Sequence, residues 1–269
     1  QMCIRDRAEL GAGGAQVTRG GLVADAVAFR GAGDPGALLA VREGRATPQD
    51  AASQAVVALV DARAGDVVLD VAAAPGGKAT GLAERLDRGV VAAVDVHAGR
   101  LGRVREAAER LGLESVRPVL ADGRALPVAG ERVDRALVDA PCSGLGVLRR
   151  RPEARLRVGE PTAELVDLQV GLVLAAAAAV RPGGRLVYSV CTFTAAETTG
   201  VAATVVEALA GRFRVAAPPE GPWRPAGPGA LILPQDAGTD GMFVLVLDRV
   251  GAEGRHPRAQ QEATDSVGA

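Results

Sequence analysis

The sequence predicts an α/β protein whose mostly parallel central sheet carries helices on both faces, the doubly wound (Rossmann-like) arrangement. Apolar runs of strand length alternate along the chain with amphipathic stretches of helix length. A Gly-rich turn at residues 74–78 joins the first apolar run to a helix. Acidic and cysteine side chains recur at the ends of the strands, and doubly wound sheets bind ligands outside the carboxyl ends of their strands.

The first 45 residues are rich in Gly and Ala and have only weak periodicity. A strand is expected at 26–30 and a short helix at 35–41. Thr47 and Pro48 have the pattern of a helix N-cap followed by a first-turn proline, so we expect the next helix to start there.

From residue 67 onward, strands and helices alternate regularly. The run 67–71 is apolar apart from Asp70, as in strands that are buried on both faces of a parallel sheet. The elements expected after it are, in chain order, a helix at 78–86, a strand at 90–94, a helix at 100–111, strands at 116–120 and 133–138, a helix at 162–180, a strand at 186–190, a helix at 194–209 and a strand at 242–247. Residues 181–184 should close the long helix, and Thr194 with Glu197 should form a capping box at the start of the next one.

Composition limits the setting and the partners. The 269 residues fit one or two domains, and a hydrophobic fraction of 48% suffices for a large core. The net charge is −1, so nucleic acid would have to bind a local basic patch. The longest aliphatic run, 172–180, is shorter than the ~20 residues that span a bilayer. We expect a cytoplasmic protein with no membrane partner, and a disordered polar tail at 250–269.

The cysteines are too few for a disulfide framework, and no cysteine–histidine cluster has the spacing of a metal site, so no metal is expected. The chain begins at Gln1, and residues 1–7 differ in character from the rest of the chain. We therefore expect a fragment or an altered end, and Cys3 is given no role.

The Gly-rich turn matches neither of two common nucleotide motifs. A P-loop requires Gly at position 72 and Ser or Thr at position 79, but both positions hold Ala. The dinucleotide fingerprint G-x-G-x-x-G is also absent. What remains is a turn whose backbone N–H groups can approach a polar ligand at the start of a helix. Lys78 is the only lysine in the chain, which suggests a chemical requirement at this turn.

Two cysteines carry most of the functional information. Cys142 lies in Val-Asp-Ala-Pro-Cys-Ser-Gly and Cys191 in Leu-Val-Tyr-Ser-Val-Cys-Thr, each at or just past the end of an expected strand. An isolated free cysteine is most often an inert buried thiol. Two thiols at converging strand ends instead favour an enzyme that bonds covalently to its substrate through sulfur.

The Gly-rich turn and the two cysteine motifs together resemble the RsmB/Sun/NOL family of S-adenosylmethionine (SAM)-dependent RNA (cytosine-5)-methyltransferases, especially its bacterial members that act on 16S rRNA. The resemblance implies the class I methyltransferase fold, with a mostly parallel seven-stranded sheet. It implies a catalytic domain at 46–249 and a remnant of a small N-terminal RNA-binding region at 1–45. Ala72 and Val190 depart from the family pattern, which usually has Cys and Thr there.

The resemblance also implies roles for individual residues. SAM would be held by the strand ends and the turn, at Ala72, Ala73, Ala74, Pro75, Gly76, Gly77, Lys78, Asp95, Asp122 and Asp139. Cys191 would add to carbon 6 of cytosine, and Cys142 would aid release. Asp139 would hold the ring while Lys78 adds positive charge. We expect the helix that begins near Thr194 to lower the pKa of Cys191.

The expected RNA contacts are the basic loop residues Arg149, Arg150, Arg151 and Arg155, which would bind phosphates. The aromatic residues near the motifs, Tyr188, Phe193 and Phe243, are expected to pack in the core. Methylation of exocyclic amines is disfavoured, because residues 139–142 read Asp-Ala-Pro-Cys rather than Asn/Asp-Pro-Pro-Tyr/Phe. The open alternatives are a tRNA cytosine-5 methyltransferase and a non-catalytic RNA-binding or ribosome assembly factor. We expect a monomer.

Overall fold

The computed structural model describes residues 16–19, 22–23, 26–31, 33–128, 130–157 and 161–251. In this part of the chain the main sheet has nine strands, in the order β5-β4-β3-β6-β7-β11-β10-β9, with β8 also paired to β11. The parallel strands are β5 (Val116–Leu120), β4 (Val90–Asp95), β3 (Val67–Val71), β6 (Val133–Asp139) and β7 (Val180–Val190). The antiparallel strands are β11 (Met242–Arg249), β10 (Gly229–Ile232), β9 (Arg224–Ala226) and β8 (Phe213–Val215).

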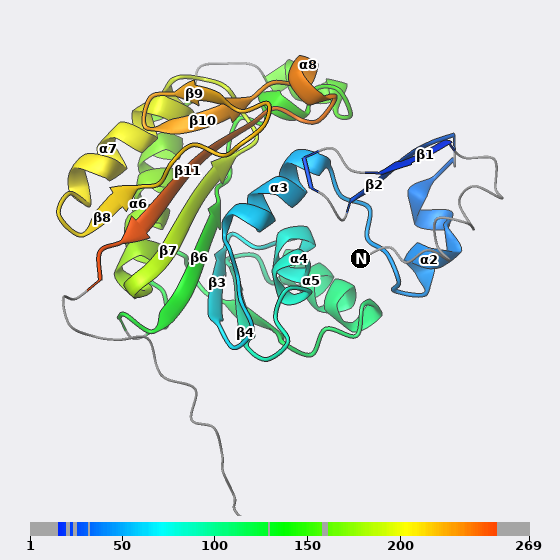
Figure 1. The fold of residues 1–269 in the computed structure, drawn as a ribbon, viewed down its shortest axis with the longest axis horizontal. Coiled ribbons are helices and arrows are strands. Elements are labelled where there is room, and N and C mark those ends of the chain that lie inside the picture. Colours follow the sequence, from blue (N-terminus) through cyan, green and yellow to red (C-terminus); the bar gives the residue numbers. More distant parts are fainter. Residues whose placement is uncertain are drawn as a thin grey trace, which may run out of the picture.

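Helices cover both faces of this sheet (Figure 1). One face carries α3 (Ala51–Leu59), α4 (Gly77–Ala83) and α5 (Ala98–Arg110), and the other carries α6 (Ala163–Ala179) and α7 (Val201–Ala208). Adjacent residues of β3 face opposite layers, because Val68 packs in the core under α3–α5 and Leu69 in the core under α6 and α7. The doubly wound class is therefore confirmed. The sheet exceeds the seven expected strands because β8 and β9, three residues each, extend its antiparallel side.

Three predicted boundaries were wrong. Helix α3 begins at Ala51 rather than after Thr47, because the N-cap is Asp50, whose carboxylate accepts a hydrogen bond from the Ala52 N–H at 2.9 Å. Helix α6 ends at Ala179, and residues 181–184 belong to β7. The expected capping box is absent, since the Thr194 hydroxyl donates to the Glu197 carboxylate and a π-helix, η4 (Ala196–Gly200), precedes α7.

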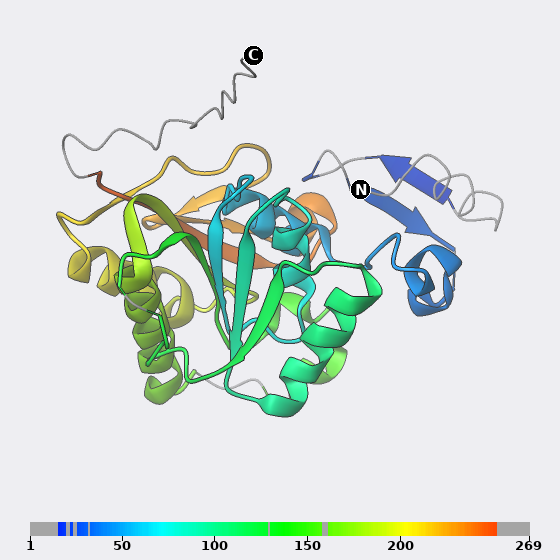
Figure 2. The same ribbon diagram turned by 90° about the horizontal axis from the view of Figure 1, so that it is seen from below.

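The N-terminal segment lies to one side of the main sheet, as Figures 1 and 2 both show. Strands β1 (Gln16–Arg19) and β2 (Val27–Arg30) form an antiparallel pair. The expected helix at 35–41 is split into a 3₁₀ turn, η1 (Pro35–Ala37), and a short helix, α2 (Leu39–Arg42). Residues 1–7 and nearly all of the expected tail lie outside the described residues. No helix in the described ranges is long and apolar enough to cross a membrane.

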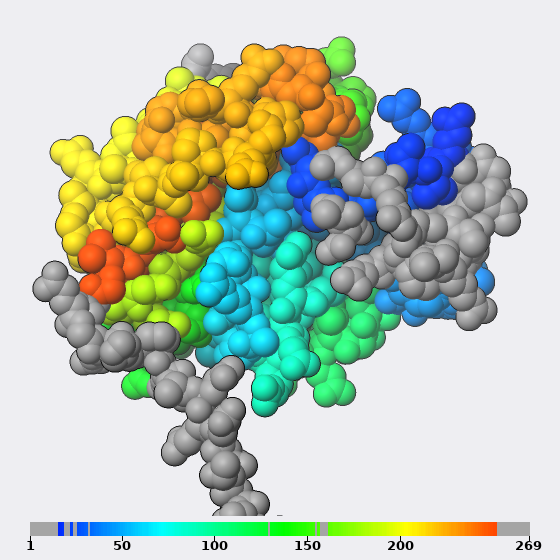
Figure 3. Space-filling view, viewed as in Figure 1, coloured from blue at the N-terminus to red at the C-terminus, as the bar shows by residue number. Residues whose placement is uncertain are grey.

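Arg110, the last residue of α5, forms hydrogen bonds that connect this segment to the rest of the fold. Its Nη1 donates to the Val41 and Ala46 carbonyl oxygens at 2.6 and 3.1 Å, and its Nη2 donates to the Thr47 hydroxyl at 3.2 Å. Gly44, at φ +73°, packs so closely that a Cβ there would clash with the Arg110 carbonyl oxygen. The Arg110 guanidinium thus holds this segment in place. In the space-filling view, the segment lies beside α4 and α5 (Figure 3).

Arg110→Gln should loosen residues 41–47 while leaving the main sheet intact. Their amide hydrogen exchange should speed up by about tenfold or more, because losing a hydrogen bond to a charged group costs about 1.5–3 kcal/mol. Arg105→Gln is the matched control, since Arg105 is an exposed arginine on the same helix. Unchanged exchange at 41–47 in Arg110→Gln would show that the guanidinium does not hold the segment.

Candidate active site

The motif residues meet at the carboxyl ends of the parallel strands. Chain order reverses between β3 and β6, since β4 flanks β3 on one side and β6 on the other. Such a switch point is where doubly wound sheets bind ligands. Asp70 lies near the end of β3, Asp139 ends β6 opposite Ser189 of β7, and Cys191 directly follows β7. The predicted convergence of strand-end residues is therefore confirmed for these positions.

The two cysteine sulfurs are in contact. Cys142 Sγ lies 3.4 Å from Cys191 Sγ, and both side chains are half-buried. Backbone hydrogen bonds join the loops around the sulfurs, because the Gly146 N–H donates to the Cys191 carbonyl oxygen and the Gly241 N–H donates to the Gly146 carbonyl oxygen, both at 2.9 Å. A Cβ at Gly146 would clash with the Gly241 backbone. The loops after β6, after β7 and before β11 are thus joined around the thiols.

An ion pair lies beside the sulfurs. Lys78 Nζ is 2.7 Å from Asp139 Oδ2, and Asp139 Oδ1 accepts a hydrogen bond from the Ser189 hydroxyl at 2.7 Å. The Lys78 side chain is only 13% exposed. Burial opposes a charge there, but Asp139 outweighs burial and the pKa of Lys78 is raised. Lys78 therefore remains a cation inside the site.

The two thiols are polarised in opposite directions. The hydrogen bond with Cys142 lowers the pKa of Cys191, burial and Asp139 oppose this shift, and Lys78 adds to it. The same hydrogen bond, together with burial, raises the pKa of Cys142. Of the two thiols, Cys191 therefore loses its proton more readily, and Cys142 is favoured as the S–H donor. The direction matches the expectation for Cys191, but its sources are the neighbouring thiol and Lys78 rather than the start of a helix near Thr194.

The Gly-rich turn is held in an unusual backbone conformation. Gly76 has φ +108°, and a Cβ there would come within 3.0 Å of the Val104 Cα of α5. Asp95, at the end of β4, supports the turn by accepting hydrogen bonds from the Ala74 N–H at 3.1 Å and the His97 N–H at 2.9 Å. A carboxylate offers about four acceptor sites, so Asp95 keeps capacity for a ligand.

Asp70 is a functional candidate to which the sequence analysis gave no role. Its side chain is fully buried, and neither carboxyl oxygen has a hydrogen-bond partner among the described residues. Burial and the nearby Asp139 hold its pKa well above the usual range. Buried polar groups nearly always have partners, so an unpartnered carboxyl at a strand end indicates a ligand-binding position. The place of Asp70 at the end of an expected strand was the signal that the sequence offered.

Asp122 does not join this cluster. It follows β5, the outermost parallel strand, and its carboxylate pairs with Arg124, whose Nη2 lies 2.7 Å from Asp122 Oδ2. Hydrogen bonds from Arg124 lower the pKa of Asp122 to about 2. Its predicted cofactor contact stays a prediction.

Two of the four arginines expected to bind RNA are engaged within the protein. Arg150 Nε lies 2.6 Å from Asp240 Oδ2, and Arg149 Nη2 lies 3.5 Å from Asp50 Oδ2. Both side chains remain about half exposed. Arg151 and Arg155 are exposed. Two ion pairs therefore hold the basic loop to Asp50 and Asp240. Its role in binding RNA stays a prediction.

The expectation for the aromatic residues was correct for two of three. Tyr188 and Phe243 are fully buried, with their rings 6.3 Å apart in an edge-to-face arrangement. Phe193, two residues after Cys191, is 40% exposed. It follows the end of β7 and so escapes the core that the strand residues enter. An exposed aromatic side chain thus follows Cys191 by two residues in the chain.

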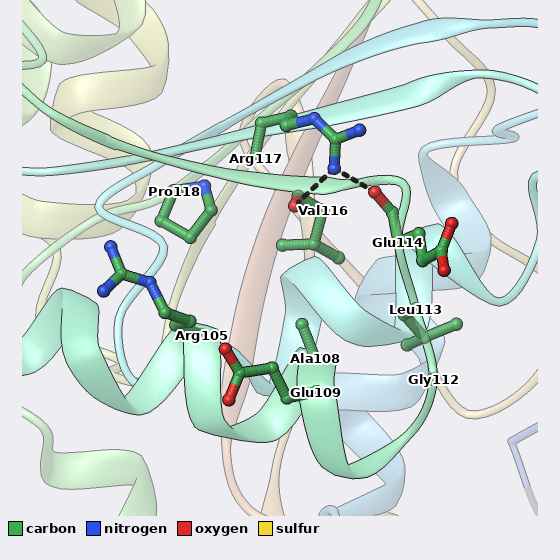
Figure 4. A pocket seen from close by; sticks show the side chains of 9 residues that line it. All are labelled: Arg105, Ala108, Glu109, Gly112, Leu113, Glu114, Val116, Arg117 and Pro118. Atoms are coloured by element: carbon green, nitrogen blue, oxygen red, sulfur yellow. Dashed lines mark hydrogen bonds between the residues drawn. The ribbon is translucent and has the colours of Figure 1, made fainter.

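Two hollows lie away from the cysteines. One, of about 630 Å³, lies between α5 and the start of β5, at the edge of the sheet opposite the cysteines (Figure 4). The other, of about 470 Å³, lies over the first turn of α5 beside Asp95. Within the described part of the chain, no three His, Cys, Asp or Glu side chains are grouped so as to hold a metal ion.

Comparison with known proteins identifies the family. A family profile described as "16S rRNA methyltransferase RsmB/F" matches residues 57–248. The probable ribosomal RNA small subunit methyltransferase B of Bacillus subtilis is 34% identical over 262 residues, covering 91% of this chain and 58% of the relative. The ribosomal RNA small subunit methyltransferase B of Vibrio cholerae is 37% identical over 211 residues, covering 77% and 47%. The chain thus spans about half the length of these relatives.

Solved structures agree with this assignment. NSun6 from Pyrococcus horikoshii, crystallised with the SAM analogue SFG, has a TM-score of 0.70 and 30% identity over 81% of this chain and 57% of its own. A methyltransferase homolog from Pyrococcus horikoshii at 24% identity, with a TM-score of 0.76 over 93% and 83%, shows the same fold. Because the profile match covers well over half of its residues, the chain belongs to the RsmB/F family of SAM-dependent 16S rRNA methyltransferases.

Proposed function

We propose that this chain transfers a methyl group from SAM to carbon 5 of a cytosine in 16S rRNA. The observation that carries the proposal is the pair of sulfurs 3.4 Å apart, with the pKa of Cys191 lowered and that of Cys142 raised. A non-catalytic RNA-binding or assembly factor has no need of such a pair. A tRNA substrate remains the second candidate, because the same thiol chemistry serves either RNA.

The residues around the Gly-rich turn fit SAM. The unpartnered Asp70 carboxyl suits the ammonium group of the methionine part, and Asp95 has acceptor capacity for ribose hydroxyls. We assign cofactor binding to residues 72–78, Asp95, Asp122 and Asp139, and add Asp70. When bound, SAM supplies the electrophilic methyl group.

Cys191 activates the target base. Carbon 5 of cytosine is a poor nucleophile, but addition of the Cys191 thiolate to carbon 6 forms a C–S bond and moves an electron pair toward carbon 5. Asp139 accepts a hydrogen bond from the amino edge of the ring, and Lys78 stabilises the negative charge that develops as the adduct forms. The ion pair holds both groups in place before the substrate arrives.

Cys142 assists release of the product. After methylation, a water molecule acting as base takes the proton from carbon 5, and the electron pair of the C–H bond re-forms the ring double bond while the carbon–sulfur bond breaks. Cys191 departs as a thiolate, and the Cys142 S–H, which faces it across 3.4 Å, donates the hydrogen bond that stabilises it. The raised pKa of Cys142 keeps this donor protonated.

The surroundings of the thiols suit an RNA substrate. Aromatic side chains stack on unpaired RNA bases, and the exposed Phe193 lies two residues after Cys191 in the chain. The exposed Arg151 and Arg155 supply positive charge for phosphates, and Arg149 and Arg150 remain half exposed despite their ion pairs.

Cys142→Ala should trap a covalent complex between the protein and RNA. The variant keeps the nucleophile but loses the donor that assists release, so an adduct resistant to denaturing gel electrophoresis should accumulate with 16S rRNA and SAM. The double variant Cys142→Ala/Cys191→Ala is the control and should give none. An adduct in the double variant, or equal trapping in Cys191→Ala alone, would contradict the assignment of Cys191 as nucleophile.

Lys78→Met and Asp139→Asn should shift the reactivity of Cys191 in opposite directions. Lys78 lowers the pKa of Cys191, so its removal should raise the pH midpoint of Cys191 alkylation by iodoacetamide. Asp139 raises that pKa, so Asp139→Asn should lower the midpoint. Peptide-resolved mass spectrometry separates Cys191 from Cys142. Midpoints that stay at the wild-type value in both variants would show that the ion pair does not tune the thiol.

A further inference from the structure

A buried carboxylate, Glu197, lies behind the two thiols and has no part in the proposed chemistry. Its side chain is fully buried, and no basic residue in the described ranges forms an ion pair with it. Its oxygens are satisfied by neutral donors, which are the Ser143 N–H at 2.8 Å, the Ser143 hydroxyl at 2.5 Å, the Gln169 Nε2 at 3.0 Å and the Thr194 hydroxyl at 2.8 Å. Burying a charge is costly, and these four hydrogen bonds offset the cost.

Three of these four donor groups come from the loops that carry the cysteines. Ser143 directly follows Cys142, and Thr194 lies three residues after Cys191. The Ser143 hydroxyl also lies 2.7 Å from the Thr192 hydroxyl, next to Cys191. Glu197 therefore bridges the loop after β6 to the loop after β7, within a few residues of each sulfur.

Two further side chains hold Glu197 from the α6 side of the sheet. Gln169 of α6 donates to the Pro141 carbonyl oxygen at 2.8 Å as well as to Glu197, and so contacts the residue before Cys142. The Tyr188 hydroxyl, on β7, donates to the Glu197 carbonyl oxygen at 2.7 Å. The α6 helix thus holds the Glu197 carboxylate and β7 holds its backbone, which is the support that a precise site requires.

We propose that Glu197 is the positioning residue that sets the distance between the Cys142 and Cys191 sulfurs. The hydrogen bond between the thiols depends on that distance, so Glu197 acts on Cys191 through Cys142. The importance of the contact between the two sulfurs for catalysis rests on the proposed function. The contact itself can be tested by measuring thiol reactivity, which needs neither RNA nor SAM.

The charges near Cys191 separate this role from a direct electrostatic one. The groups whose charges shift the pKa of Cys191 are Asp139, Lys78 and Asp240, from the end of β6, the start of α4 and the loop before β11. All three remain in variants of Glu197. A changed Cys191 reactivity in those variants therefore reports the position of Cys142.

The test compares Cys191 alkylation against pH in wild type, Glu197→Gln and Glu197→Ala, with thermal unfolding measured alongside. Glu197→Ala frees both loops, so alkylation of Cys191 near pH 7 should slow by roughly three- to tenfold and its midpoint should rise. Glu197→Gln keeps a side chain of the same shape that can bond Ser143, Gln169 and Thr194, and should change the rate less than Glu197→Ala. Glu207→Ala, an exposed glutamate on α7, is the matched control and should match wild type.

The outcomes decide between three roles. A lower unfolding temperature in Glu197→Ala with an unchanged alkylation profile would overturn the proposal and leave Glu197 as a stabiliser of the fold. Equal, large changes in Glu197→Gln and Glu197→Ala would also overturn it, because they would make the charge, not the bridge, responsible.

A second variant covers the case in which Glu197→Ala does not fold. Ser143→Ala removes the hydroxyl contacts with Glu197 and Thr192 but keeps the backbone contact, so it should slow Cys191 alkylation by a smaller factor. A wild-type profile in folded Ser143→Ala would overturn the proposal. If the wild-type protein methylated no RNA, the proposed function would be wrong, but the effect of Glu197 on the reactivity of Cys191 would still hold.

Discussion

The ion pair between Lys78 and Asp139 is the contact on which the rest of the site depends. It joins the start of α4 to the end of β6 and so spans the switch point of the sheet. Without the Lys78 cation, the acidic groups Asp139, Asp70 and Cys191 would lie close together with no positive charge among them. With it, Asp139 is paired with a cation and accepts a hydrogen bond from Ser189, burial and Asp139 raise the pKa of Asp70, and the pKa of Cys191 is lowered. One lysine thus allows the anions to share a small volume.

Most of the fold and the centre of the site followed from the sequence, for physical reasons. Strands buried on both faces read as continuous apolar runs, and parallel strands bring their carboxyl ends to one edge. Those two facts placed Asp139, Cys142 and Cys191 together without any contact being known. Helix starts were less certain, because Asp50 caps α3 where Thr47 and Pro48 had the stronger local pattern. Asp50 also accepts a hydrogen bond from the Asp240 N–H, 190 residues away in the chain, and the local pattern could not show this contact.

The features that the sequence did not predict all depend on long-range pairing. Arg149 and Arg150 looked like free cations because their partners, Asp50 and Asp240, are distant in the chain. Glu197 looked like a capping residue because Thr194 is three residues before it, but its main partners are Ser143 and Gln169. A buried glutamate cannot be recognised from the sequence alone, because its local sequence pattern matches that of a glutamate on the surface. It is recognised only when the packing around it is known.

The central claim is that the polarised thiol pair methylates carbon 5 of cytosine, and the identity of the methylated nucleoside tests it most directly. Unmodified 16S rRNA would be incubated with SAM and either wild-type protein or Cys191→Ala, digested to nucleosides and analysed by mass spectrometry. If Cys191 is the nucleophile, 5-methylcytidine should form with the wild-type protein and not with Cys191→Ala. A product methylated at another atom, or 5-methylcytidine formed equally by Cys191→Ala, would contradict it.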